Sequence, residues 1–101
     1  MNADAFDKMK PGALFVNTAR GPLCDYDALY HALTKGDLGG AMLETFAIEP
    51  VPEDWPLLKL DNVTLTPHIA GASVRTITFA AEMAAEEVKR FLAGDPACNP
   101  C

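Results

Sequence analysis

Three short apolar runs divide the first two thirds of the chain, and each is followed by a polar turn. The runs cover residues 13–16, 41–46 and 63–65. The core of the first run, Leu-Phe-Val at 14–16, has no polar position and is bounded by Gly12 and Asn17. Continuous apolar runs of this length are typical of strands buried in a parallel sheet. The pattern therefore predicts three strands of an open α/β sheet.

Helical periodicity appears between the first two runs. Asp25 is a suitable N-cap, Gly36 a suitable C-terminal stop, and the apolar stripe between them consists of Leu29, Ala32 and Leu33. Strand, helix and strand within about 30 residues form a βαβ unit, whose crossover is right-handed. A shorter helix is expected over residues 4–9, before the Lys10-Pro11-Gly12 stop.

A second and longer helix is predicted after Ser73, which is a good N-cap, and before Gly94 and Pro96. Its apolar positions repeat at spacings of four and three, at Ile77, Ala81, Ala84, Val88 and Phe91. About 20 residues at ~1.5 Å each give a length of roughly 30 Å, which is long for so small a domain. We expect its apolar stripe to face a core or a subunit interface, and the chain to be part of a larger protein.

The segment after residue 46 is rich in proline, with Pro50, Pro52 and Pro56. We expect a surface loop that carries functional residues. Its own apolar side chains, Trp55, Leu57 and Leu58, should attach it to the body of the domain.

Composition narrows the classes of partner. The 101 residues carry a net charge of −6 without a run of Lys or Arg, which argues against a nucleic-acid or anionic-membrane surface. No apolar run approaches the ~20 residues of a membrane span, and the acidic N-terminal segment has no signal-peptide core. We expect a cytoplasmic protein whose three cysteines are free thiols, with Cys24 acting as a small buried apolar residue.

Arg20, Glu49 and His68 stand just past the three apolar runs. Ligands of open α/β sheets bind outside the carboxyl ends of the strands. A cation, a carboxylate and an imidazole at that edge would make an acid–base site with an anchor for an anion. Taken singly, the three have plainer interpretations: a solvated arginine, an exposed glutamate and a structural histidine.

Other candidate features are weaker. Cys98 and Cys101 have C-x-x-C spacing but lack the flanking strand and helix of a redox motif, and a zinc site would need further ligands, so no metal site is predicted. His31 is expected to be a surface or interface residue. The sequon at Asn62 has no meaning in a cytosolic chain.

Three linked motifs resemble the D-isomer-specific 2-hydroxyacid dehydrogenases. The matching stretches are Met-Lys-Pro-Gly-Ala at 9–13 leading into Asn-Thr-Ala-Arg-Gly at 17–21, Gly-Ala-Met-Leu-Glu-Thr-Phe at 40–46 leading into Glu49-Pro50, and Leu-Thr-Pro-His-Ile-Ala-Gly at 65–71. The resemblance implies the C-terminal half of a Rossmann-like NAD(P)-binding domain with a long C-terminal helix. It divides the chain into a core at 1–72, a helix at 73–93 and a tail at 94–101.

The resemblance also implies an activity, the transfer of a hydride between NAD(P)H and a small 2-oxo or 2-hydroxy acid. His68 would be the acid/base, Glu49 its carboxylate partner and Arg20 the substrate anchor. Contacts to the cofactor, NAD or NADP, are implied for Thr18, Ala19, Arg20, Glu44, His68, Ile69, Ala70 and Gly71. A homodimer is implied for the full-length protein.

Two departures from the family pattern qualify this expectation. The 101 residues contain no G-x-G-x-x-G fingerprint, which holds the dinucleotide pyrophosphate. We therefore expect the isolated chain to be inactive, and a non-catalytic, truncated module that interacts through its long helix is the alternative. Glu44 stands where the family usually has aspartate near the nicotinamide, so its carboxylate is displaced by one methylene.

Overall fold

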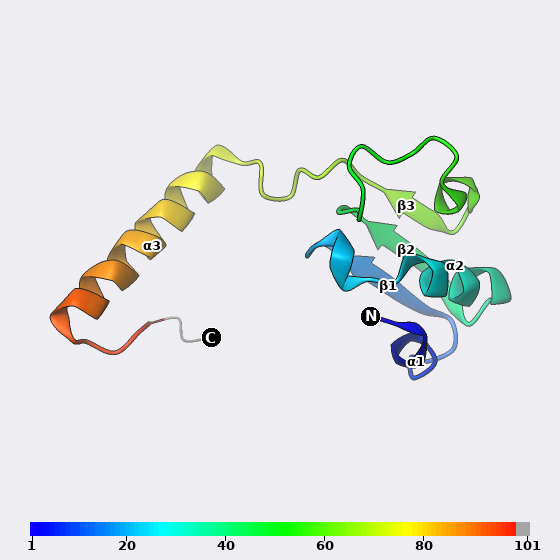
Figure 1. Ribbon diagram of the computed structural model, residues 1–101, viewed down its shortest axis with the longest axis horizontal. Coiled ribbons are helices and arrows are strands. Elements are labelled where there is room, and N and C mark those ends of the chain that lie inside the picture. Colours follow the sequence, from blue (N-terminus) through cyan, green and yellow to red (C-terminus); the bar gives the residue numbers. More distant parts are fainter. Residues whose placement is uncertain (99–101) are drawn as a thin grey trace. The chain divides into compact units, whose positions relative to one another are not determined.

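The computed structural model describes residues 1–98, which form two compact units, Met1–His68 and a second unit that starts at Ile69. The order of elements in the first unit is α1 (Ala3–Phe6), β1 (Ala13–Asn17), the 3-10 turn η1 (Gly21–Leu23), α2 (Tyr26–Lys35), β2 (Leu38–Leu43), the 3-10 turn η2 (Pro56–Lys59) and β3 (Val63–Leu65) (Figure 1). The second unit contains one helix, α3 (Val74–Ala93).

The first unit is built on a three-stranded parallel sheet in the order β1-β2-β3. Asn17 pairs with Leu43 and Leu43 pairs with Leu65, so the three strands end level with one another. This confirms the predicted parallel α/β architecture. The level ends bring the three following turns to one edge of the sheet.

The second strand begins and ends three residues earlier than the apolar run at 41–46 predicts. Its first residues include Gly39, whose backbone lies so close to Gly12 that a Cβ would stand 2.5 Å from the Gly12 oxygen. Gly39 stands at a shift in the register, since Ala13 pairs with Leu38 and Leu14 pairs with Gly40, and its lack of a Cβ permits this close approach. The pairing stops at Leu43 because β1 and β3 stop there, which leaves residues 44–46 in the turn.

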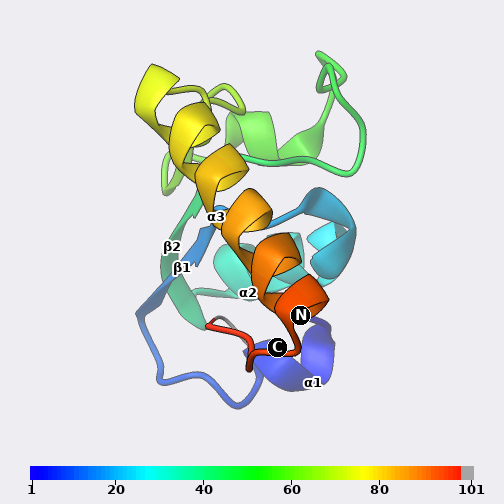
Figure 2. The same ribbon diagram turned by 90° about the vertical axis from the view of Figure 1, so that its left-hand side faces the viewer.

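Helix α2 covers one side of the sheet, as both views show (Figures 1 and 2). Its caps are those expected: Oδ1 of Asp25 accepts a hydrogen bond from the Ala28 amide at 3.0 Å, and Gly36 adopts the left-handed conformation at φ 82°. The predicted stripe is buried and packs in the core with Leu38, Leu43 and Leu57.

The opposite side of the sheet differs from the prediction of a buried strand. Leu14 and Val16 of β1 are 73% and 57% exposed, while Phe15 between them packs towards the core. The alternation arises because consecutive side chains of a strand point to opposite faces, and within the first unit only the α2 face of the sheet is covered.

Two local predictions need correction. Leu57 is buried and Trp55 packs edge-on against the rings of Tyr26 and Phe46, but Leu58 is 42% exposed and does not attach the loop. Helix α1 ends at Phe6 and does not reach residue 9, because the Met9 amide already closes a turn on the Phe6 carbonyl.

Helix α3 has the predicted bounds. Oγ of Ser73 accepts a hydrogen bond from the Thr76 amide at 3.0 Å, and Gly94 ends the helix in the left-handed conformation. Within its own unit, none of the residues of α3 is buried. Within residues 1–98, no helix is both long and apolar enough to cross a membrane.

Candidate active site at the carboxyl edge of the sheet

The turn after β1 is held by the side chain of its last residue, Asn17, which is only 6% exposed. Oδ1 of Asn17 accepts a hydrogen bond from the Ala19 amide at 3.0 Å, and Nδ2 donates to the Arg20 carbonyl at 3.4 Å. Asparagine suits this position because its amide can satisfy a donor and an acceptor of the turn together. The exposed Arg20 side chain starts from this closed turn, and its Nη1 donates to the Ala19 carbonyl at 2.6 Å.

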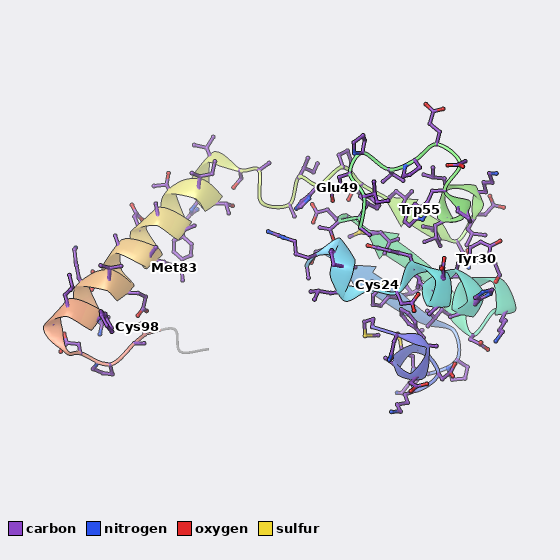
Figure 3. All side chains as sticks on the ribbon, in the orientation of Figure 1. Cys24, Tyr30, Glu49, Trp55, Met83 and Cys98 are labelled. Carbon is purple, nitrogen blue, oxygen red and sulfur yellow. The ribbon has the colours of Figure 1, made fainter. Side chains whose placement is uncertain are left out.

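The turn after β2 brings Glu49 to His68. Nδ1 of His68 lies 3.1 Å from Oε2 and 3.2 Å from Oε1 of Glu49, while Oε1 also accepts a hydrogen bond from the Phe46 amide at 2.9 Å. Glu49 is labelled in Figure 3, on the green loop at the carboxyl edge of the sheet. The side chains of His68 and Glu49 are 39% and 41% exposed, so the pair is open to solvent and to a ligand.

Hydrogen bonds favour the charged form of Glu49. The Phe46 amide makes the largest contribution to lowering the pKa of this carboxyl group below its ordinary value, followed by the hydrogen bond to His68. The Arg20 guanidinium lowers the pKa further by its charge. Glu49 is therefore ionised at neutral pH.

The pairing also differentiates the two ring nitrogens of His68. Nδ1 faces the Glu49 carboxylate, so a proton on Nδ1 is held by that acceptor. Nε2 is the ring atom left to exchange a proton with a ligand. The arrangement has the parts of a general acid–base site, a histidine oriented by a carboxylate.

The remaining predicted residues are distributed over both units. Thr18 and Ala19 lie in the turn that Asn17 closes. Glu44 follows β2 directly, is buried, and its amide donates to the Asn17 carbonyl at 3.1 Å. Ile69, Ala70 and Gly71 follow His68 along the chain and belong to the second unit.

Sequence reasoning missed two contributions to this site. The side chain of Asn17 organises the Arg20 turn, and the main-chain amide of Phe46 orients Glu49. The role of Asn17 could have been predicted from the sequence, since an asparagine after an apolar strand is a common turn former. The role of the Phe46 amide could not, because every residue except proline has a main-chain N–H group.

Two of the three cysteines, Cys24 and Cys98, lie in the described part of the chain. Cys24 is buried, as predicted, and burial raises the pKa of its thiol to about 11, which makes it a poor nucleophile at neutral pH. Cys98 is exposed, and its proposed C-x-x-C partner Cys101 lies outside the described residues. Within residues 1–98, no group of three His, Cys, Asp or Glu side chains could hold a metal ion. His31 is exposed on α2, as expected.

A parallel βαβ sheet with charged turns at its carboxyl edge is typical of nucleotide-binding domains of the Rossmann class. The sequence model of the family "D-isomer specific 2-hydroxyacid dehydrogenase, NAD binding domain" matches residues 1–70. The chain therefore belongs to the D-isomer specific 2-hydroxyacid dehydrogenases.

Curated relatives are longer than this chain. A glyoxylate reductase of Korarchaeum cryptofilum is 50% identical over 88 residues, which are 87% of this chain and 26% of that protein. The human glyoxylate reductase/hydroxypyruvate reductase is 40% identical over 95 residues, which are 94% of this chain and 29% of that protein. The chain thus spans between a quarter and a third of the length of these two relatives.

Solved structures show the same fold. A D-isomer specific 2-hydroxyacid dehydrogenase of Xanthobacter autotrophicus Py2, in complex with NADPH and MES, superimposes with a TM-score of 0.75 at 42% identity, over 98% of this chain and 40% of that one. The apo D-mandelate dehydrogenase of Rhodotorula graminis superimposes with a TM-score of 0.76 at 37% identity, over 100% of this chain and 29% of that one.

Proposed function

We propose that this chain is the part of an NAD(P)-dependent D-2-hydroxyacid dehydrogenase that carries the acid–base residues. The reaction would reduce a small 2-oxo acid to its D-2-hydroxy acid. The observation that carries this proposal is the contact between His68 and Glu49 at the carboxyl edge of the sheet, with 3.1 Å between Nδ1 and Oε2. Residues 1–72 would be the C-terminal portion of the NAD(P)-binding domain, 73–93 its long helix and 94–101 a tail.

His68 would supply the proton of the reduction. Its Nδ1 faces Glu49, so the proton that reaches the carbonyl oxygen of the substrate would leave from Nε2. The Glu49 carboxylate would stabilise the protonated ring and fix its orientation, as carboxylate partners of histidines do. In the reverse direction the same nitrogen would take the proton of the hydroxyl group.

Arg20 would anchor the carboxylate of the substrate. A guanidinium can donate two parallel hydrogen bonds to a carboxylate, which fixes the distance and the orientation of the acid together. Nη1 of Arg20 donates to the Ala19 carbonyl, and this hydrogen bond orients the guanidinium. The remaining N–H groups of the guanidinium would be the donors to a substrate.

The residues present fit the nicotinamide end of a dinucleotide. The Thr18–Ala19 turn and the buried carboxylate of Glu44 follow adjacent strands at the carboxyl edge, where nucleotide-binding sheets hold this group. Ile69, Ala70 and Gly71 would complete the contacts. When bound, reduced NAD or NADP would supply the hydride to the carbonyl carbon. The glycine fingerprint for the pyrophosphate is not part of the 101 residues.

A chimaera tests the proposal, with this segment in place of the matching 88-residue segment of the Korarchaeum cryptofilum glyoxylate reductase. The chimaera should reduce glyoxylate with NADH or NADPH. His68→Ala should lower kcat by roughly 10²–10⁴, the usual contribution of a general acid. His31→Ala, which changes an exposed histidine on α2, is the matched control and should keep wild-type turnover.

Wild-type turnover in the His68→Ala chimaera would remove His68 from the reaction. The alternative function, an interaction module, rests on α3, whose apolar stripe is not buried within its own unit. A folded but inactive chimaera would favour this alternative over the dehydrogenase.

A further inference from the structure

Gly21 joins two of the turns at the candidate active site. It follows Arg20 directly, is buried, and begins the 3-10 turn η1. A Cβ atom placed on Gly21 would overlap the carbonyl carbon and oxygen of Phe46 and the amide nitrogen of Ala47. The main chain of the Arg20 turn therefore lies directly against the peptide that joins Phe46 to Ala47.

Space, and not backbone conformation, requires a glycine at this position. The glycines with positive φ among the described residues are Gly12, Gly36 and Gly94, so Gly21 has dihedral angles open to other residues. Each atom that a Cβ would overlap belongs to the backbone, which cannot rotate away as a flexible side chain does. Any side chain at position 21 would have to separate the two turns.

The peptide that Gly21 contacts belongs to the turn that orients Glu49. The amide of the same Phe46 donates to Oε1 of Glu49 at 2.9 Å, and Glu49 contacts His68. On the other side, Asn17 binds the Arg20 carbonyl and holds the Arg20 turn to the end of β1. A continuous set of contacts thus runs from Arg20 through Gly21 to Glu49 and His68.

We propose that Gly21 is a positioning residue: its lack of a side chain lets the Arg20 turn rest on the Phe46–Ala47 peptide and sets the spacing between the anchor and the acid–base pair. We assign this role on the basis of the function proposed above, in which Arg20 and His68 act on one substrate. A displacement of about 1 Å between such groups can cost roughly 10²-fold in rate.

The first test needs no substrate and uses the full 101-residue chain. Gly21→Ala should displace the Phe46 amide from Glu49, and the pKa of Glu49 should rise towards its ordinary value because this amide is the largest cause of the lowering. The pKa is read from the side-chain carbonyl carbon of Glu49 by NMR. Gly39→Ala is the matched control, since its Cβ also meets a backbone atom, the Gly12 oxygen at 2.5 Å, but at the start of β2.

An unchanged pKa of Glu49 in folded Gly21→Ala would overturn the proposal, as would an equal rise in Gly39→Ala. If Gly21→Ala does not fold, the contact is tested in the unaltered chain. A nuclear Overhauser effect between the Hα protons of Gly21 and the amide proton of Ala47 is expected, and its absence would overturn the proposal.

The second test uses the glyoxylate-reducing chimaera. Gly21→Ala should lower kcat/KM by roughly 10²-fold more than Gly39→Ala does, and an equal effect of the two variants would overturn the positioning role. The His68→Ala variant decides the proposed function separately. A failure of Gly21→Ala to affect the rate, beside a large effect of His68→Ala, would therefore reject the role of Gly21 alone.

Discussion

The main-chain amide of Phe46 and the carboxylate of Glu49 are joined by a 2.9 Å hydrogen bond within one turn. This bond holds one carboxylate oxygen, Oε1. Nδ1 of His68 lies 3.1 Å from Oε2 and 3.2 Å from Oε1. Glu49 is therefore held both by the backbone of the turn that follows β2 and by His68.

The first prediction concerns which hydrogen-bond partner, the Phe46 amide or His68, lowers the pKa of Glu49 more. The pKa of Glu49 should lie below 4.5, its ordinary value, in the folded chain. His68→Ala should raise that pKa because a hydrogen bond is lost, but the pKa should stay below the ordinary value because the Phe46 amide, the larger cause, remains. An NMR titration of the Glu49 carboxyl carbon in both chains measures this. A full return to the ordinary value would show that His68, and not the amide, controls the carboxylate.

A pH dependence of stability accompanies the lowered pKa. The pKa of Glu49 is lower in the folded chain than in the unfolded chain. Its contribution to the free energy of unfolding is therefore present above the ordinary pKa and is lost as the pH falls through the lowered pKa. The free energies of unfolding of wild type and Glu49→Gln, measured with denaturant, should therefore converge as the pH falls below the Glu49 pKa. Curves that stay parallel at every pH would contradict this prediction.

The sequence predicts best those features of the fold that local chemistry sets. Asp25 and Gly36 bound α2 as expected, because an N-cap side chain and a left-handed glycine act within one turn. The apolar run predicts that β2 ends at Phe46, but the strand ends at Leu43. Its end is set by pairing with the two neighbouring strands, not by the length of the apolar run. The prediction that Leu14 is buried was wrong because burial depends on what covers the second face of the sheet, which the strand's own sequence does not specify.

The candidate site shows the same division. The contact between Glu49 and His68 was predictable from motifs at strand ends, because parallel strands bring their carboxyl ends to one edge. The main-chain donor of Phe46 and the close approach of Gly21 were not, since both arise from backbone packing between turns that are distant in the sequence.

The third prediction concerns a buried hydroxyl group. Thr45 is 1% exposed, and its Oγ1 has no hydrogen-bond partner among the described residues. A buried polar group without a partner costs about 1–3 kcal/mol of stability. Thr45→Val, which has nearly the same shape, should therefore leave the free energy of unfolding unchanged or raise it by about 1 kcal/mol. Thr64→Val, at an exposed position of β3, is the control for added strand propensity. Clear destabilisation by Thr45→Val alone would mean that the hydroxyl group has a partner.

The fourth prediction tests which face of the sheet is the core. Leu43 of β2 is fully buried, so Leu43→Ala should lower the free energy of unfolding by about 2–5 kcal/mol, through lost burial and the cavity left behind. Leu14→Ala, on the exposed face of β1, should change it by no more than about 0.5 kcal/mol. Urea unfolding of the 101-residue chain measures both. Equal losses would show that the second face of the sheet is covered in solution.

The last prediction concerns the difference between two cations at position 20. In the glyoxylate-reducing chimaera, Arg20→Lys keeps the positive charge but removes the planar pair of donors that can bind a carboxylate bidentately. The loss of a charged hydrogen bond is worth about 1.5–3 kcal/mol, so kcat/KM for glyoxylate should fall by roughly 10- to 10²-fold. Arg90→Lys is the matched control: Arg90 lies in the last turn of α3 and pairs with Glu86, so this change should leave kcat/KM as it is. Steady-state kinetics at saturating NADH decides the outcome. If Arg20→Lys matched the control, the charge of Arg20 would be sufficient and bidentate anchoring of the substrate would be excluded.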